Sequence, residues 1–409
     1  MKILILSLIF SPDNVSTAQI WSGIAEDLAR AGHDLCVITT TPHFNRDESL
    51  EANHQLRPFL GKLIQKSALG DIPVYHILMP SKHIWTPLRL LSWISFHILS
   101  TLVGWFLKFK PEAIIAPSPP LTIGLSAWAI GLVRRAQYIY NVQEIYPDIA
   151  VNLGMMKNSR IINFFKRMER FIYNKSMAVT SITPAMCAKI KERVAPEKVH
   201  HIPNFVDLSD IKEVPRDNAF AKTYDLQGRF VVTYAGNMGV PQNLGILIEL
   251  AKVLPEITVL FVGDGGDAAR LKSIAQGVPN VRFVPYQPLS RMPEIYACSD
   301  LFYVGQDPKA CSDGIPSKIY RILGYRKPLL ILTSPNSDLA QFVATTKSGI
   351  LLSSDTSQAA IQLQTLIAQS GTLKQMGQDG YDYVSTVFAR PIISQQYETL
   401  CKQALETRV

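Results

Sequence analysis

Lys318 stands near the start of a predicted helix, in a stretch whose residue types suit the binding of an anion. The stretch reads Asp313-Gly314-Ile315-Pro316-Ser317-Lys318, and apolar residues then recur at helical spacing. Pro316 fits a first helical turn, where its missing N–H costs nothing, and Ser317 is a good capping residue. Free N–H groups at a helix start, together with the ammonium of Lys318, attract phosphate. Taken alone, so short a motif more often marks an ordinary surface helix.

Strands and helices that alternate along the chain must position this stretch. Residues 3–10 predict a buried parallel strand, because no small-residue cleavage site follows them as it would in a signal peptide. A helix at 18–31 and a buried strand at 35–39 then indicate a doubly wound sheet. The alternation restarts at 230–235. We therefore expect an α/β chain of two similar halves, with these parts: a first domain at 1–207, a linker at 208–228, a second domain at 229–388, and a C-terminal helix at 389–409 that packs back on the first domain.

Polar and glycine-rich loops follow the predicted strands, at the sheet edge where α/β proteins bind ligands. In the first half Ser16 and Thr17 follow the first strand, and Glu144 and Asp148 follow a strand at 138–142. A structural role as a helix cap remains open for Asp148. In the second half the loops contain Gly236 and Asn237, Gly263 and Asp264, and Tyr286 and Gln287.

Composition narrows the class of protein. The 409 residues are 47% hydrophobic and 18% charged, which excludes a disordered chain. Residues 1–209 hold 22 Lys and Arg against 15 Asp and Glu, so the first half is basic and suits lipid headgroups or a phosphorylated acceptor. Nucleic acid is the least favoured partner, since no arginine-rich arm or zinc-finger spacing is present. Five scattered cysteines indicate reduced thiols in a cytoplasmic protein.

Residues 84–110 are the most hydrophobic part of the chain, with Trp85, Trp93 and Trp105 in them and basic residues on both sides. Three interpretations compete: a bilayer span, a helix in the membrane interface, and a core helix. A span would disrupt the sheet, because a predicted strand follows at 113–116. We expect a helix that packs on the sheet and exposes part of its apolar face for docking at the inner face of the plasma membrane.

Seven short motifs in this order resemble the retaining family-4 nucleotide-sugar glycosyltransferases, which have the two-domain GT-B fold. The resemblance covers nearly the whole chain and is strongest to bacterial enzymes of the colanic-acid and O-antigen type. The motifs are Ala31-Gly32-His33-Asp34, Ala116-Pro117-Ser118-Pro119-Pro120, Ile145-Tyr146-Pro147-Asp148, Ile202-Pro203-Asn204-Phe205-Val206-Asp207, Tyr234-Ala235-Gly236-Asn237-Met238-Gly239, Val262-Gly263-Asp264-Gly265 and Pro316-Ser317-Lys318.

The resemblance implies transfer of a sugar, possibly glucose, from a UDP-sugar to a lipid-linked or polysaccharide acceptor of the cell envelope. It implies no metal and no cofactor besides the donor. Lys318, Asp313 and Glu144 would serve catalysis. The other residues assigned to the donor are Ser16, Thr17, Gly236, Asn237, Gly263, Asp264, Tyr286, Gln287, Gly314, Ile315, Pro316, Ser317 and Arg321.

Three departures from the family pattern concern the donor site. Where relatives often have two glutamates separated by seven residues, this chain has Asp313 and Arg321, and a guanidinium cannot accept hydrogen bonds from a ribose. The loop 236–242 lacks the usual Arg and Lys, and the first loop lacks its glycines. Two alternatives therefore stay open: a UDP-sugar 2-epimerase of the same fold, and a catalytically silent nucleotide-binding scaffold subunit.

Overall fold

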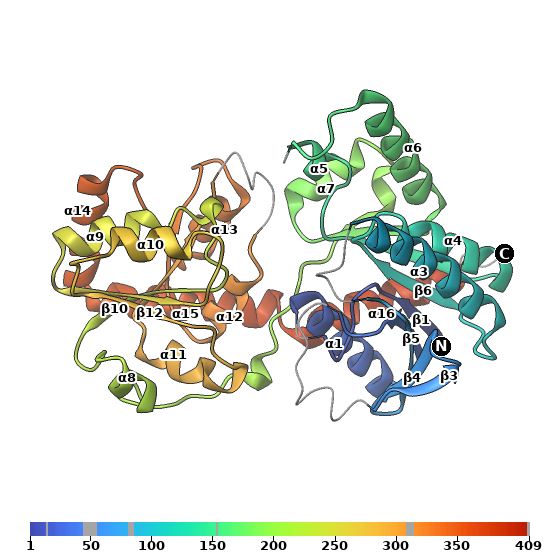
Figure 1. The fold of residues 1–409 in the computed structure, drawn as a ribbon, viewed down its shortest axis with the longest axis horizontal. Helices are drawn as coiled ribbons and strands as arrows, with labels where there is room; N and C mark the ends of the chain where they lie inside the picture. The colour runs from blue at the N-terminus through green and yellow to red at the C-terminus, as the bar shows by residue number, and fades with distance from the viewer. Residues whose placement is uncertain (14, 44–54, 81–85, 153, 308–314, 407–409) are drawn as a thin grey trace. The chain divides into compact units, whose positions relative to one another are not determined.

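The computed structural model describes residues 1–13, 15–43, 55–80, 86–152, 154–307 and 315–406, and these residues form two compact units. The first unit combines residues 1–204 with 390–409, and the second comprises residues 205–389. Figure 1 labels many of the elements of both. The predicted α/β class and the division into two Rossmann-like halves are confirmed, since each unit contains a parallel or mostly parallel sheet between helices.

Nine of the described strands form the sheet of the first unit, in the order β3-β4-β5-β2-β1-β6-β7-β8-β9. These strands are β1 (Lys2–Leu6), β2 (Asp34–Thr40), β3 (Arg57–Leu60), β4 (Ile64–Leu69), β5 (Ile72–Ile77), β6 (Ala113–Pro117), β7 (Gln137–Val142), β8 (Ala178–Ser181) and β9 (Val199–His201). All adjacent pairs are parallel except β3–β4 and β4–β5, which are antiparallel. This antiparallel extension was not predicted.

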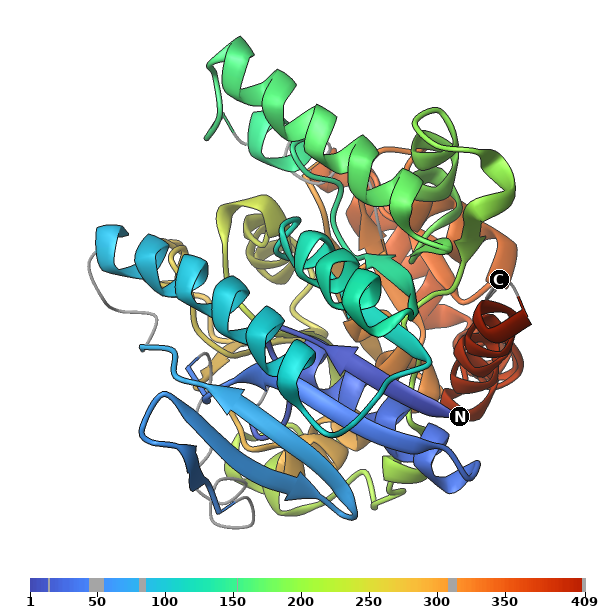
Figure 2. The same ribbon diagram turned by 90° about the vertical axis from the view of Figure 1, so that its right-hand side faces the viewer.

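Helices cover both faces of this sheet. They are α1 (Ser16–Arg30), α3 (Thr86–Phe106), α4 (Ile123–Arg134), α5 (Asp148–Asn152), α6 (Ser159–Lys175), α7 (Pro184–Lys191) and α16 (Arg390–Glu406). Figure 2 shows α3, α4 and α6 side by side on one face, and α4 contacts both neighbours. On the opposite face α16 packs against α1 and reaches β6 and β7. The core between these layers is apolar and includes Ile38, Phe96, Ile114 and Tyr140.

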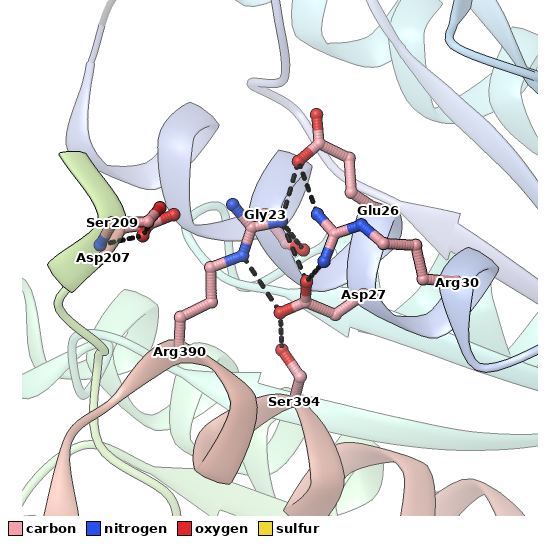
Figure 3. Close-up of polar contacts among 8 residues, drawn as sticks. All are labelled: Gly23, Glu26, Asp27, Arg30, Asp207, Ser209, Arg390 and Ser394. Atoms are coloured by element: carbon pink, nitrogen blue, oxygen red, sulfur yellow. Dashed lines mark hydrogen bonds and ion pairs between the residues drawn. The ribbon is translucent and has the colours of Figure 1, made fainter. Parts of the chain in front are cut away.

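Arg390, the first residue of α16, ties that helix to α1 (Figure 3). Its guanidinium contacts the carboxylates of Glu26 at 2.7 Å and Asp27 at 2.9 Å. Ser394 donates a further hydrogen bond to Asp27, at 2.7 Å. Two polar groups of α16 and two carboxylates of α1 thus fix the C-terminal helix on the first unit, although it is more than 360 residues from α1 in sequence.

In the described part of the second unit, six strands form a parallel sheet in the order β12-β11-β10-β13-β14-β15. They are β10 (Phe230–Ala235), β11 (Ile257–Val262), β12 (Val281–Val284), β13 (Leu301–Gly305), β14 (Leu329–Leu332) and β15 (Gly349–Leu351). The helices are α8 (Ala219–Thr223), α9 (Gly245–Val253), α10 (Ala268–Ile274), α11 (Met292–Cys298), α12 (Lys318–Gly324), α13 (Asp338–Thr346), α14 (Thr356–Ala368) and α15 (Ser370–Val387). Helices α9, α10 and α14 pack on one face, and α8, α11, α12 and α13 pack on the other.

Residues 208–228 differ from the linker that their polar composition predicted. They contain a short 3-10 helix (Leu208–Asp210) and α8, and they belong to the second unit. The reason is hydrophobic: Phe220 is fully buried and packs in one cluster with Val231 and Leu260. Asn218 caps α8, because its side-chain oxygen accepts a hydrogen bond from the backbone N–H of Ala221 at 2.9 Å. A polar residue at this position therefore marks a helix start and not a linker.

Candidate functional site

The order of strands in the second unit creates a switch point beside β10. The chain runs from β10 outward to β11 and β12, and then returns to the other side of β10 as β13. Connections from β10 and β13 therefore leave in opposite directions and open a crevice at the carboxyl ends of these strands, where α/β sheets bind ligands. Gly236 directly follows β10, and Lys318 lies on the connection that follows β13.

Lys318 and Gly236 meet at this switch point. The ammonium nitrogen of Lys318 donates a hydrogen bond to the carbonyl oxygen of Ala235 at 3.2 Å. It lies over the ring of Tyr234, 4.3 Å from the ring centroid. A Cβ added to Gly236 would come within 3.0 Å of the same nitrogen, so a glycine leaves room for the cation. Tyr234 is held in place because its hydroxyl donates to the carbonyl of Asn237 at 2.5 Å.

The charge of Lys318 has no carboxylate partner among the residues that the structure describes. Burial without a counter-ion lowers the pKa of Lys318 from 10.5 to about 8. The ring of Tyr234 and one carbonyl oxygen compensate only part of the lost hydration of an ammonium. An anion bound in the crevice would supply the missing counter-charge.

Two glycine contacts bring the next loop against this one. A Cβ on Gly263 would lie 2.1 Å from the carbonyl oxygen of Gly236, and one on Gly265 would lie 2.3 Å from that of Met238. The loops are also joined by a hydrogen bond from the N–H of Met238 to the carbonyl of Asp264, at 2.8 Å. Glycine is thus required at both positions for the backbones to approach so closely.

Tyr286 extends the site outward, whereas Gln287 adds little to it. The ring of Tyr286 is 61% exposed, and its hydroxyl donates to the carbonyl of Asp264 at 3.3 Å. Such an exposed ring beside a glycine-rich loop is able to stack on a base. The amide of Gln287 donates to the nearby carbonyls of Pro285 and Tyr286, so its hydrogen bonds stay within its own loop.

The beginning of α12 differs from the prediction. The helix begins at Lys318, and Ser317 makes no capping hydrogen bond through its side chain. Ser317 already has helical backbone angles of −57° and −24°, whereas a capping side chain needs extended ones. With seven residues the helix is short, and the argument for an anion site therefore rests on Lys318. Pro316 accepts the N–H of Ile319, and Ile315 packs on the core beneath α12.

Arg321 lies one turn further along α12, in a pocket of about 270 Å³. The pocket is lined by Ile211, Lys212, Ser290, Met292, Pro293, Arg321 and Tyr325. The two cations at its wall, Lys212 and Arg321, have no ion pair with a described residue. Asp313 and Gly314, the other predicted donor residues of this stretch, lie outside the described residues.

In the first unit the switch point lies between β1 and β6, with Ser16 and Thr17 on the connection that leaves β1. They are the first two residues of α1. Glu144 follows β7, the strand next to β6, and its exposed carboxylate has no hydrogen bond or ion pair with a described residue. Neighbouring atoms that shield the carboxylate from part of the water raise the pKa of Glu144. A carboxylate that is left unpaired at a strand end is available to a ligand.

Asp148 is occupied by a structural contact. Its carboxylate pairs with Arg193, which also contacts the buried carboxylate of Glu169 at 2.8 Å. Glu169 in turn accepts a hydrogen bond from Tyr173 at 3.0 Å. This network anchors the loop that carries Glu144 to α6, so Asp148 holds the loop and leaves Glu144 open.

Two groups near the same edge were missed in the sequence. The buried Asp13 accepts the backbone N–H of His43 at 3.2 Å, which joins the loops after β1 and β2. Gln143 and Asn204 exchange hydrogen bonds through their side-chain amides, at 3.0 and 3.1 Å. Gln143 directly follows the buried strand β7, which was the available signal for the second group, whereas Asp13 stands well beyond the end of β1 and gives no such signal.

No cluster of three or more His, Cys, Asp or Glu side chains suited to a metal ion occurs among the described residues. Within the same residues, no helix combines the length and the apolar character needed to cross a bilayer. On the sequence alone, a bilayer span was one of three competing interpretations of residues 84–110.

Comparisons with known proteins identify relatives. Residues 17–204 match the model of the glycosyl transferase 4-like domain. The chain is 27% identical over 358 residues to the putative colanic acid biosynthesis glycosyl transferase WcaI of Escherichia coli, covering 84% of this chain and 86% of that protein. It is 29% identical over 154 residues to the alpha-galactosylglucosyldiacylglycerol synthase of Streptococcus pneumoniae, covering 35% and 39% of the two chains. The structure of Anabaena HepE in complex with UDP matches with a TM-score of 0.72 and 17% identity, over 98% of this chain and all of that one.

Proposed function

Because the chain is a glycosyltransferase of the GT-B fold, with residues 17–204 in the glycosyl transferase 4-like family, we propose that its donor is a UDP-sugar. The single observation that carries this proposal is the unpaired ammonium of Lys318 at the switch point of the second unit. A diphosphate placed there would neutralise it. HepE, which shares the fold, was crystallised with UDP, and this supports the choice of uracil.

The diphosphate is also the leaving group, so its growing negative charge is what the enzyme must stabilise. Lys318 does this directly, in a site where a hydrogen-bonded cation is worth more than in water. Gly236 and Gly263 allow the phosphates to approach the backbone. Tyr286 stacks on the base. Arg321 stands where relatives commonly have a glutamate, and it donates hydrogen bonds to the ribose or to a phosphate. Glucose is the first sugar to test. Asp313 would hold hydroxyls of this sugar.

The transfer proceeds with retention and without a metal or an enzyme nucleophile. The bond from C1 of the sugar to the diphosphate breaks, and the acceptor oxygen bonds to C1 from the same face. The acceptor proton passes to the departing phosphate oxygen. Glu144 orients the acceptor hydroxyl through its unpaired carboxylate, with Ser16 and Thr17 nearby in the same unit.

The acceptor is a lipid-linked glycan of the cell envelope, handled by the protein at the inner face of the plasma membrane. The names of two relatives support this choice: one acts in colanic acid biosynthesis, and the other makes a glycosylated diacylglycerol. The basic first half of the chain suits an acceptor with a phosphorylated lipid.

Incubation with UDP-glucose and other UDP-sugars, with and without lipid-linked oligosaccharides, tests the proposal. Transfer that needs an acceptor and conserves the α-anomeric proton signal in NMR spectra is expected. Conversion of the sugar at C2 without an acceptor would instead indicate an epimerase. Tight binding of UDP with no turnover of any donor would indicate a scaffold subunit.

A further inference from the structure

Helix α3 turns several polar side chains inward and exposes a row of large apolar side chains. His97 faces α4, where its ring nitrogens contact the hydroxyls of Thr122 at 2.7 Å and Ser126 at 3.1 Å. Ser100 is fully buried. Large apolar side chains recur on the exposed side at spacings of three or four residues: Leu91, Ile94, Ile98, Leu102 and Phe106. A helix whose outer face meets water normally shows the reverse pattern.

The exposed row of α3 carries no charge. No residue between Leu91 and Phe106 is Asp, Glu, Lys or Arg, and Phe106 is 80% exposed. The inner face accounts for the packing of the helix, because Phe96 and Val103 are buried in the core and Trp105 donates to the carbonyl of Ala129 at 2.9 Å. The outer row therefore has no role in the core of the first unit.

Helix α6 supplies the positive charge on the same face of the sheet (Figure 2). Its exposed cations are Arg160, Lys166, Arg167, Arg170 and Lys175, and the exposed Lys157 lies just before the helix. None of them has an ion pair with a described residue. The one carboxylate of α6, Glu169, is turned inward to Arg193 and Tyr173. Ile161 and Phe164 are exposed among these cations, and Phe164 is 62% exposed.

Both apolar rows begin near one edge of the sheet. Helix α3 follows β5, and α6 follows β7 after the short helix α5, so their N-terminal ends lie on the side of the carboxyl ends of the strands. Glu144 lies at that edge as well, directly after β7. An apolar row next to unpaired cations fits a bilayer with anionic headgroups, where the cations meet phosphates and the apolar side chains enter the acyl boundary.

We propose that the outer faces of α3 and α6 form a surface that docks on anionic lipid bilayers. The sequence pointed to a membrane contact through the hydrophobic residues 84–110 and the basic first half of the chain. The structure identifies α6 as a helix that exposes cations on the same face of the sheet as α3, and these cations would favour anionic lipids. The surface would hold the protein where a lipid-linked acceptor is anchored. The inference does not depend on the proposed reaction, because docking is measured without a donor.

Sedimentation with vesicles tests the proposal. Vesicles of equal parts phosphatidylglycerol and phosphatidylcholine are compared with vesicles of phosphatidylcholine alone, with no nucleotide present. We expect binding to the anionic vesicles only, and its loss as salt shortens the Debye length from about 10 Å at 0.1 M to about 3 Å at 1 M. Equal binding to both kinds of vesicle would overturn the proposal.

Paired variants locate the surface. Arg160→Glu with Arg167→Glu, and separately Ile98→Ser with Phe164→Ser, should each lower vesicle partition by about tenfold or more. Lys272→Glu with Lys374→Glu, and Val253→Ser with Ile361→Ser, are matched controls at exposed sites of the second unit and should leave partition unchanged. Equal effects of variants and controls would contradict the proposal. A dimer in solution that Phe164→Ser dissociates would contradict it too, because the occupant would then be a second copy.

Discussion

The ammonium of Lys318 lies 4.3 Å from the centroid of the Tyr234 ring and 3.2 Å from the carbonyl oxygen of Ala235. Tyr234 lies in β10 and Lys318 begins α12, more than eighty positions later, and the switch point of the sheet brings them together. A cation in this position is held by a ring face and a carbonyl while one side stays available to an anion. The proposed donor site is centred on this pair.

Replacing Lys318 with Met should lower turnover by about ten- to a hundredfold, the value of a charge-assisted hydrogen bond of about 1.5–3 kcal/mol. Thermal stability should not fall, because the variant no longer buries an unpaired ammonium. Initial rates and melting curves measure both effects. Lys272→Met removes an exposed cation of the same unit and serves as the control. Equal rates for the two variants would mean that Lys318 has no role in the reaction.

Binding of UDP should weaken as the pH rises above about 8. The folded-state pKa of Lys318 lies at about 8, below its ordinary 10.5, so the free protein loses this charge in that range. UDP favours the charged form, and its phosphates are already ionised above about pH 6, so the complex takes up a proton at pH 8.5. Titration in buffers of different ionisation enthalpy detects this uptake. If the proton uptake persisted in Lys318→Met, another group would be its source.

The same depressed pKa predicts how stability depends on pH. Burial of the charged ammonium costs stability below pH 8, and this cost fades as the pH rises towards 10.5. The difference in unfolding free energy between the wild type and Lys318→Met should therefore shift in favour of the wild type from pH 7 to pH 10. Urea unfolding at several pH values measures it. A constant difference would mean that Lys318 keeps an ordinary pKa.

Adjacent glycines offer a matched test of the loop contact. A Cβ at Gly265 would lie 2.3 Å from the carbonyl oxygen of Met238, whereas one at Gly266 meets nothing within 4 Å. Gly265→Ala should destabilise the protein by about 1–3 kcal/mol and weaken UDP binding, because overpacking separates the two loops. Gly266→Ala should do neither. Chemical denaturation and calorimetry compare the pair, and similar behaviour of both variants would refute the contact.

Replacing Glu144 with Gln should lower the transfer rate while leaving UDP affinity unchanged. The carboxylate is unpaired and belongs to the first unit, whereas the predicted nucleotide contacts are concentrated in the second. Loss of the charged hydrogen bond that orients the acceptor hydroxyl, about 1.5–3 kcal/mol, costs about ten- to a hundredfold in rate. Glu192→Gln changes another exposed, unpaired carboxylate of the first unit and is the control. Equal losses of transfer and nucleotide binding in Glu144→Gln would indicate a structural role.

Much of the fold was predictable because parallel strands and their helices have strong local signals. The strand at 230–235 matches its predicted bounds, and the strands predicted at 113–116 and 138–142 each differ from the structure by one residue. The hairpin of β4 and β5 was missed, although Gly70, with a positive φ of 56°, and Asp71 form its turn and are a recognisable signal. The sequence at 57–60 is exposed throughout, and so lacks the alternation that marks a half-buried strand.

The site was predictable at the level of loops but not of contacts. Strand-end positions pointed to Gly236 and Gly263, and a predicted helix start pointed to Lys318, because topology fixes where such segments meet. The pairing of Lys318 with Tyr234 depends on side-chain directions that spacing does not give. The capping role of Ser317 was wrong for the same reason, since its backbone angles are set by the packing of Ile315 and Ile319.

Calorimetric titration with UDP, GDP and ADP, with and without magnesium, tests the central claim most directly. The wild type should bind UDP in preference to the other two, with the same affinity when magnesium is chelated, and Lys318→Met should bind it at least about tenfold more weakly. Absence of binding by any of the three nucleotides, or equal affinity of the wild type and Lys318→Met for UDP, would contradict the assignment of a UDP-sugar site to the crevice beside β10.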